Sequence, residues 1–170
     1  MQTQELKIPK ERVGVLIGEK GTIKRRIEKK AKVKIDVTAE GDVTIEGDFL
    51  GVYETINVVK AIGRGFNPEI SENLFKDNFA FEIIDLNDFA GKSQKKRTRL
   101  KGRVIGEDGK ARKFIENYTN VHISVFGKTI TIIGDIEEVT VAKQAIEMLL
   151  EGSPHTSVYR WMEKKIRSLR

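Results

Sequence analysis

A pair of glycines three residues apart occurs twice in this sequence of 170 residues, each time after a short apolar run and before a basic segment. The first pair is Gly18 and Gly21, and the second, 88 residues later, is Gly106 and Gly109. A Gly-x-x-Gly turn between two helices lets another backbone approach closely, because neither glycine carries a Cβ atom. The helix after the turn begins with unpaired N–H groups at the positive end of its dipole, which favours a phosphate. Each turn therefore predicts a clamp for a nucleic-acid backbone.

The surroundings of the two turns repeat as well, which indicates an internal duplication. Apolar residues and one glutamate coincide at an offset of 88, and the offset becomes 87 after the next turn of the chain. Two segments of helical periodicity, 49–63 and 136–150, follow the matched strands, and each ends shortly before a proline. The matched pairs include Ile17 with Ile105, Ile27 with Ile115, Glu28 with Glu116, Val33 with Val121, Ile35 with Ile123, Ile45 with Ile132 and Asp48 with Asp135.

Hydrophobic periodicity assigns the same series of elements to both repeats, in the order β-α-α-β-β-α. This is the order of a type I KH domain, whose glycine turn grips about four nucleotides by their backbone. The elements expected in the first repeat are a strand over 5–8, helices over 10–17 and 21–30, strands over 32–38 and 43–46, and a helix over 49–63. The second repeat supplies its own first strand over 79–86.

We therefore predict an α+β fold of two tandem type I KH domains, each a three-stranded sheet backed by helices. The first domain is expected over 1–76, with an added helix over 68–75. The second is expected over 77–170, with a basic C-terminal helix over 154–170.

Positive charge is concentrated around the two turns. The chain carries a net charge of +6 with an isoelectric point near 9.4, which favours a polyanionic partner. Residues 7–30 hold nine Lys and Arg against three Glu, and residues 95–113 hold nine against two acids. The joining stretch 64–91 is acidic instead, with two basic and six acidic residues. Only 7% of the residues are aromatic, which argues for a groove with an aliphatic floor rather than an aromatic stacking platform.

The candidate RNA-binding residues are the turns, the aliphatic residue before each turn and the neighbouring cations. A purely structural interpretation treats the glycines as helix C-caps, the cations as solvated charges and the aliphatic residues as core. Because more cations flank the second turn, we predict that it is the primary RNA site and the first an auxiliary one. The candidates are Ile17, Gly18, Glu19, Lys20, Gly21, Lys24 and Arg25 in the first repeat, and Arg103, Ile105, Gly106, Glu107, Asp108, Gly109, Lys110, Arg112 and Lys113 in the second.

Other classes of function find little support. The absence of cysteine excludes disulfides and thiolate metal sites, and neither His122 nor His155, expected in a turn, has a catalytic partner nearby in sequence. Gly91-Lys92-Ser93 resembles the end of a P-loop, but Leu86 stands where that loop needs a glycine. We expect a cytoplasmic, non-enzymatic protein with no catalytic residues, no cofactor, no metal and no membrane partner.

The second half resembles the partner-of-Nob-one family, small-subunit ribosome assembly factors with archaeal homologues. The resemblance implies binding of single-stranded RNA near the 3′ end of small-subunit rRNA, beside the maturation endonuclease and other assembly or translation initiation factors. A general KH adaptor that presents RNA to a nuclease or exosome-like complex is the alternative. The motifs that carry the resemblance are 102–110, Ile115-Glu116-Asn117, Ile132-Ile133-Gly134, Gly152-Ser153-Pro154 with Val158-Tyr159, Ile84-Asp85-Leu86 and Gly91-Lys92-Ser93.

Two features set this chain apart from that pattern. Eukaryotic relatives have lost the glycine turn of the first repeat, whereas Gly18 and Gly21 are intact here, so the first repeat is also a candidate RNA site. The tail 154–170 combines basic residues with an apolar stripe that includes Trp161. We expect this tail to lie outside the RNA clamp, where it either packs on the second repeat or presents an apolar surface to a protein partner.

Overall fold

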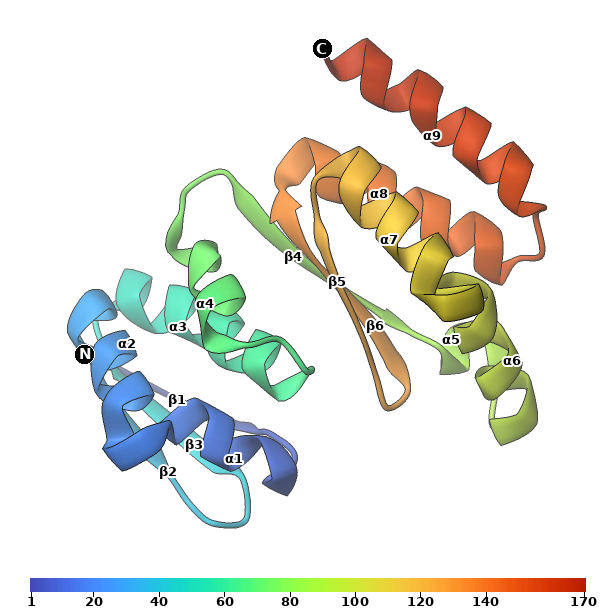
Figure 1. Cartoon of the computed structure of the whole chain (residues 1–170). Helices are drawn as coiled ribbons and strands as arrows, with labels where there is room; N and C mark the ends of the chain where they lie inside the picture. The colour runs from blue at the N-terminus through green and yellow to red at the C-terminus, as the bar shows by residue number, and fades with distance from the viewer. The chain divides into compact units, whose positions relative to one another are not determined.

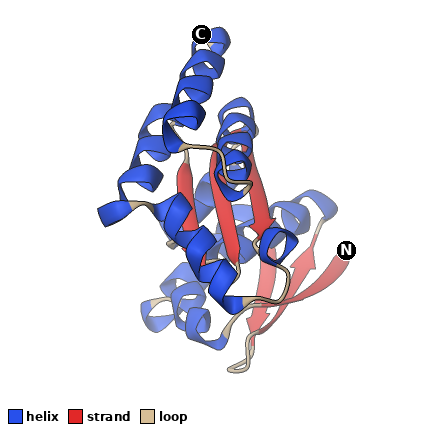
Figure 2. Ribbon diagram, turned by 90° about the vertical axis from the view of Figure 1, so that its right-hand side faces the viewer, coloured by secondary structure: helices blue, strands red, loops and turns tan.

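The computed structural model describes all residues 1–170 and divides them into two compact units, Met1–Asp77 and Asn78–Arg170. Each unit contains one three-stranded antiparallel sheet whose central strand comes last in sequence among the three. Helices cover one face of each sheet, as the ribbon views show (Figure 1, Figure 2). The predicted architecture of two α+β domains, each a three-stranded sheet backed by helices, is confirmed.

The first unit has the strand order β1-β3-β2. Strand β3 pairs with both neighbours, so that Leu6 of β1 lies opposite Val43 and Ile35 of β2 lies opposite Ile45. The core side chains Leu16, Ile27 and Ile45 come from three different elements and are fully buried. The elements are β1 (Gln2–Lys7), α1 (Lys10–Ile17), α2 (Thr22–Ala31), β2 (Val33–Val37), β3 (Asp42–Gly47), α3 (Phe49–Gly63) and α4 (Pro68–Ser71), followed by a 3-10 turn over Glu72–Phe75.

The second unit repeats this plan with the strand order β4-β6-β5. It has a further short helix after its first strand and a long helix at its C-terminal end. Its core combines isoleucine, valine, leucine and alanine side chains, of which Ile115, Ile132 and Ile146 are fully buried. Its elements are β4 (Phe79–Asp85), α5 (Asn87–Ala90), α6 (Gln94–Ile105), α7 (Lys110–Thr119), β5 (His122–Phe126), β6 (Thr129–Asp135), α8 (Ile136–Leu150) and α9 (His155–Leu169).

Several boundaries differ from those predicted. Strand β1 begins at Gln2 rather than residue 5, because its exposed polar residues are held by backbone pairing with β3 and not by burial. The predicted single helix over 68–75 is instead α4, capped by Asn67, and a separate 3-10 turn. Helix α6 extends back to Gln94, where the Ser93 hydroxyl accepts a hydrogen bond from the Lys96 amide. The P-loop-like serine is therefore a helix N-cap.

Helix α9 forms an outer layer of the second unit and packs on α8 and α7 (Figure 1). Its side chains Val158, Met162 and Ile166 are buried in the core of that unit. Most of the tail's apolar stripe is therefore buried within the second unit, as expected if the tail packs on the second repeat.

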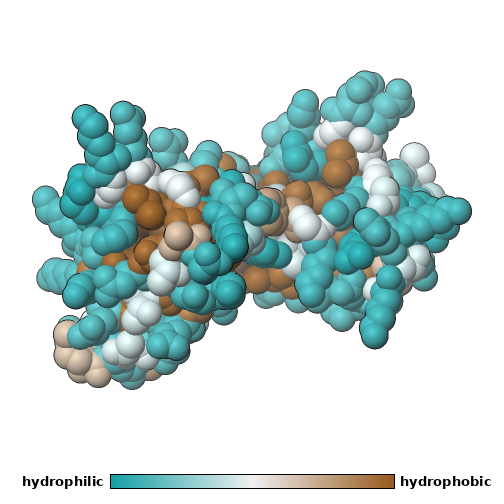
Figure 3. Space-filling model, turned by 90° about the horizontal axis from the view of Figure 1, so that it is seen from below, coloured by the Kyte–Doolittle hydropathy of each residue, from teal (hydrophilic) through white to brown (hydrophobic).

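The surface seen in Figure 3 is mainly hydrophilic, with smaller groups of apolar side chains between the polar ones. In the first unit Phe49, Leu50 and Tyr53 are exposed at the start of α3, where the two aromatic rings stack at 6.4 Å. None of the helices combines the length and the apolar character required to cross a membrane.

Candidate nucleic-acid interface

The two Gly-x-x-Gly turns have the same backbone conformation. Gly18 and Gly106 both adopt φ 75° and ψ 174°, and the second glycines, Gly21 and Gly109, both lie in the left-handed region at φ 75°. Between them, Lys20 and Asp108 also have φ 55°, which few L residues adopt. Because one rare geometry is built from two different sequences, the turn conformation is a property of the glycine spacing.

The first glycine of each pair is required by packing. A Cβ atom at Gly18 would lie 2.3 Å from Cγ1 of Ile23, and one at Gly106 would lie 2.7 Å from Cβ of Ala111. These distances are far below van der Waals contact, so a side chain at either position would push the following helix away from the turn. The absence of a side chain at the first glycine therefore allows the helix after the turn to pack closely against it.

The second glycine of each pair faces open space. A Cβ atom at Gly109 would meet only Cε of Lys113, at 3.9 Å. At Gly21 the nearest atom is Nη1 of Arg25, 2.9 Å away at the end of a flexible side chain. A backbone from another molecule can therefore approach both second glycines, and the approach is wider at Gly109.

The helices that follow the turns begin without side-chain caps. Neither Gly21 before α2 nor Gly109 before α7 can supply one, and neither first turn contains an acidic residue. The N–H groups at these helix ends are thus left for solvent or for an acceptor that comes from outside. Together with the open glycine and the nearby cations, each helix end favours an anionic group.

Some of the predicted phosphate contacts have partners within the protein. Lys24 lies 3.3 Å from Glu28, whose other oxygen accepts a hydrogen bond from the Ile35 amide at 2.9 Å. The second unit repeats this arrangement, with Arg112 at 3.7 Å from Glu116, which accepts from the Ile123 amide at 2.9 Å. Each glutamate therefore braces its helix against a strand and draws one cation towards itself.

Arg103 also has a structural partner. Its Nε donates to the Leu149 carbonyl at 2.8 Å, and its Nη2 donates to the Ser153 carbonyl. Arg103 therefore holds the end of α8 and the start of the tail, so its first role is to position these segments.

The remaining candidates lie at the surface of the turns. Ile17 and Ile105 are half-buried, whereas their neighbours Leu16 and Val104 belong to the core. A partly exposed aliphatic residue thus lies beside each turn, where a groove floor would be. The exposed charged candidates are Glu19, Lys20 and Arg25 in the first unit and Glu107, Asp108, Lys110 and Lys113 in the second.

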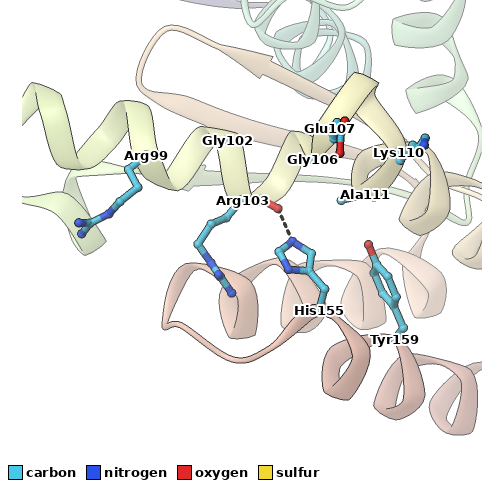
Figure 4. Close-up of a pocket in the computed structure, with 9 residues that line it drawn as sticks. All are labelled: Arg99, Gly102, Arg103, Gly106, Glu107, Lys110, Ala111, His155 and Tyr159. Carbon is cyan, nitrogen blue, oxygen red and sulfur yellow. Dashed lines mark hydrogen bonds between the residues drawn. The ribbon is translucent and has the colours of Figure 1, made fainter.

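Sequence reasoning missed one part of the second site. The tail was expected to lie outside the clamp, whereas α9 lies beside the second turn and contributes His155 and Tyr159 to a pocket there (Figure 4). His155 is the first residue of α9 and not part of a turn, and its Nε2 lies 2.8 Å from the Arg103 carbonyl oxygen. The pocket has a volume of about 460 Å³ and is lined by Arg99, Gly102, Arg103, Gly106, Glu107, Lys110, Ala111, His155 and Tyr159.

The repeat did not predict this arrangement, because the first unit has only the short helix α4 and a 3-10 turn at the place that the long helix α9 takes in the second. The only available signal was the amphipathic tail with two aromatic residues near its start. No group of three or more His, Cys, Asp or Glu side chains is arranged to hold a metal ion.

The fold and the paired turns define the class of protein. A family model described as a eukaryotic-type KH domain (KH-domain type I), that of the second PNO1 domain, matches residues 80–167. A general KH-domain model matches residues 3–61. The prediction of two KH domains is confirmed, and the chain has the fold of tandem type I KH proteins.

The relatives narrow this class. A KH domain-containing protein of Methanocaldococcus jannaschii is 49% identical over 94% of this chain and 72% of its own length. The pre-rRNA-processing protein PNO1 of Eremothecium gossypii is 31% identical over 59% of this chain, which spans only 38% of that longer protein. A solved complex of a/eIF2alpha, aDim2p and rRNA from Pyrococcus horikoshii contains a similar chain, with 42% identity, a TM-score of 0.90 and coverage of 98% and 95% of the two chains. The chain belongs to the PNO1 family of KH-domain proteins, as its motifs predicted.

Proposed function

We propose that this chain binds single-stranded RNA through its Gly-x-x-Gly turns, with the second turn as the main site. The observation that carries the proposal is the open second glycine, Gly109, at the uncapped start of α7. A phosphate there meets free amide groups and no side chain, while Lys110 and Lys113 lie exposed on the same helix. The half-buried Ile105 offers an aliphatic surface to an unpaired base.

The first domain takes the auxiliary role in this proposal. Its turn has the same backbone geometry, but Arg25 reaches over Gly21 and narrows the approach. The exposed Lys20 and Arg25 still supply positive charge. We expect this domain to contact RNA with less affinity and little sequence preference.

The proposed target is the 3′ region of small-subunit rRNA during ribosome assembly. The support comes from relatives: PNO1 proteins are pre-rRNA-processing proteins, and a similar aDim2p chain has been solved with rRNA and a/eIF2alpha. In this proposal the chain is a non-enzymatic cytoplasmic factor that holds the rRNA end for a maturation endonuclease. The alpha subunit of translation initiation factor 2 is a further proposed partner.

Binding of short labelled RNAs to the whole chain tests this function. We expect single-stranded RNA from the 3′ end of small-subunit rRNA to bind more tightly than a scrambled strand, and both to bind more tightly than a hairpin stem. The logarithm of the binding constant should fall linearly with the logarithm of salt concentration, because phosphate contacts release counterions.

Three outcomes contradict parts of the proposal. Equal binding of stem and single strand rules out a KH-type groove. Equal binding of the rRNA end and the scrambled strand favours the general KH adaptor instead. Cleavage of the RNA by the purified chain, with or without a divalent metal ion, removes the assignment as a non-enzymatic factor.

A further inference from the structure

The pocket beside the second turn lies next to the surface already described and shares only part of it. Gly106, Glu107, Lys110 and Ala111 belong to the turn region, whereas Arg99, Gly102 and Arg103 lie along α6 and the two aromatic residues come from α9. The pocket therefore adjoins the surface of the second turn. Figure 4 shows side chains from α6 and α9 facing each other across it.

Two exposed cations of this pocket are specific to the second unit. At the offset of 88 residues, Arg99 corresponds to Glu11 and Lys110 to Thr22. In contrast, the cations further along the helix after each turn are matched, since Arg112 corresponds to Lys24 and Lys113 to Arg25. The repeat thus keeps the cations of the turn in both units, but only the second unit adds Arg99 and Lys110.

Gly102 keeps the pocket open. It lies within α6, and a Cβ atom there would meet nothing within 4 Å, so packing does not require a glycine. Glycine inside a helix lowers stability relative to alanine. Gly14 is the matching residue of α1, and its Cβ direction is equally free. This pair provides matched positions at which a larger side chain fits the fold.

The α9 side of the pocket offers directional hydrogen bonds. Tyr159 packs against Phe114 with ring centres 4.2 Å apart and the ring planes tilted by 30°, and its hydroxyl makes no hydrogen bond within the protein. Burial raises the pKa of Tyr159, so the hydroxyl stays protonated at neutral pH and is able to donate. Because the Arg103 carbonyl can only accept, Nε2 of His155 donates to it, and Nδ1 of the neutral ring is left as an acceptor. The pocket therefore presents one donor and one acceptor beside the exposed cations Arg99 and Lys110.

We infer that this pocket is a nucleotide subsite, which takes the nucleotide next to those held by the second Gly-x-x-Gly turn. Arg99 and Lys110 neutralise its phosphate, and Tyr159 and His155 contact its base or ribose. The inference rests on the proposed RNA-binding function and extends the footprint of the second domain beyond the groove of about four nucleotides.

A series of RNA lengths tests the subsite with the whole chain. We expect affinity to rise by about fivefold or more when a bound tetranucleotide is lengthened by two nucleotides on the pocket side, because an additional phosphate and base are engaged. Replacement Gly102→Leu fills the pocket and should abolish this increase while it leaves tetranucleotide binding unchanged. Gly14→Leu is the matched control and should preserve the increase.

Two milder variants separate charge from hydrogen bonding. Arg99→Glu introduces the residue that the first unit carries at the matching position, and it should reduce the salt slope by about 0.7 for one lost phosphate contact. Tyr159→Phe keeps the ring contact with Phe114 and removes only the hydroxyl. It should lower the affinity for the longer RNA by about threefold to tenfold.

The outcomes distinguish the subsite from the underlying function. If no RNA length binds, or if Gly109→Asp leaves binding intact, the proposed function itself fails. If Gly109→Asp weakens all lengths while Gly102→Leu retains the full increase with length, the turn binds RNA but the pocket does not. An equal loss in Gly14→Leu and Gly102→Leu also overturns the subsite, because only one of them alters the pocket.

Discussion

Arg103 donates a hydrogen bond from Nε to the carbonyl oxygen of Leu149 at 2.8 Å, which ties the helix before the second turn to the end of α8. The first unit makes the corresponding bond from Arg12 to the Ile62 carbonyl at 2.7 Å. The two carbonyls match at the repeat offset of 87, but Arg12 aligns with Leu100, about one helical turn before Arg103. Both units therefore have an arginine that ties the helix before the turn to the end of the helix after the sheet, although the arginine lies at a different position along its helix.

Replacement Arg103→Lys should destabilise the second unit by about 1–3 kcal/mol, because an ammonium group cannot reproduce two directed bonds to the separate carbonyls of Leu149 and Ser153. Urea unfolding of the whole chain, followed by near-ultraviolet signals of Trp161, measures this loss. Arg99→Lys, at an exposed position on the same helix, is the control and should leave the free energy of unfolding unchanged. An unchanged midpoint for Arg103→Lys contradicts this stabilising role.

Replacement Gly109→Asp should weaken RNA binding more than Gly21→Asp does. Aspartate tolerates the left-handed backbone better than most residues, and the new side chain meets only Cε of Lys113, so the fold should survive. The carboxylate then occupies the phosphate position and repels it. Affinity should fall by about tenfold or more at Gly109 and by less at Gly21, as measured by fluorescence anisotropy.

Circular dichroism provides the control for both glycine variants, since each must retain the helix content of the native chain. Gly18→Asp and Gly106→Asp serve as a contrast, because a Cβ atom there clashes with the following helix. They should lower stability as well as affinity. A greater loss of binding in folded Gly21→Asp than in folded Gly109→Asp reverses the proposed ranking of the two domains.

Replacement Glu116→Ala should loosen the contact between α7 and β5. The carboxylate accepts from the Ile123 amide at 2.9 Å, and a hydrogen bond to a charged group contributes about 1.5–3 kcal/mol. Hydrogen exchange of the Ile123 amide should therefore accelerate more than that of other amides in β5. Asn117→Ala, at the exposed neighbouring position, should leave this amide protected. Uniform acceleration across the sheet points to general destabilisation instead.

The carboxyl group of Glu138 has a pKa above its ordinary value. Burial raises its pKa, the nearby Asp135 and Glu137 raise it further, and Arg170 opposes them. One of its oxygens is buried with no hydrogen-bond partner. The folded state therefore binds a proton at Glu138 more tightly than the unfolded state does. The free energy of unfolding decreases as the pH rises from the pKa of the unfolded state to that of the folded state.

Replacement Glu138→Gln should accordingly stabilise the chain near neutral pH, by less than about 1 kcal/mol because the carboxyl group remains partly solvated. The gain should disappear below about pH 4, where the wild-type carboxyl is protonated in both states. Urea unfolding at the two pH values measures it. A stabilisation that is independent of pH contradicts the electrostatic cause.

Truncation after Gly152 should unfold the second unit or destabilise it by more than about 4 kcal/mol, because it removes the buried side chains of Val158, Met162 and Ile166. RNA binding should be lost in parallel, as expected for the alternative in which the tail packs on the second repeat. Trp161→Ala tests the partner hypothesis separately, since Trp161 is only half-buried. It should keep RNA affinity and lose binding to the maturation endonuclease. A truncated chain that folds and binds RNA normally contradicts the structural role of α9.

The repeat and its hydrophobic periodicity determined the architecture. The helices Lys10–Ile17, Phe49–Gly63 and Ile136–Leu150 begin and end at the predicted residues. Their boundaries could be predicted because they depend on local properties of the chain. These properties are the periodicity of apolar residues and the glycine and proline residues that end helices. The glycine turns were predictable for the same reason, since both the Gly-x-x-Gly spacing and the preference of positive φ for glycine are local properties.

Only the tertiary structure decided which of the charged and aromatic residues are available to a ligand. Arg103 finds its partner Ser153 at a separation of 50 residues, and α9 brings His155 and Tyr159 to a turn formed by α6 and α7. A sequence pattern records which face of an element is buried, but it does not record what that face meets. The sequence by itself therefore determined two KH domains and their turns. The packing of α9, whose place in the first unit is taken by the short helix α4 and a 3-10 turn, decided the shape and charge of the second site.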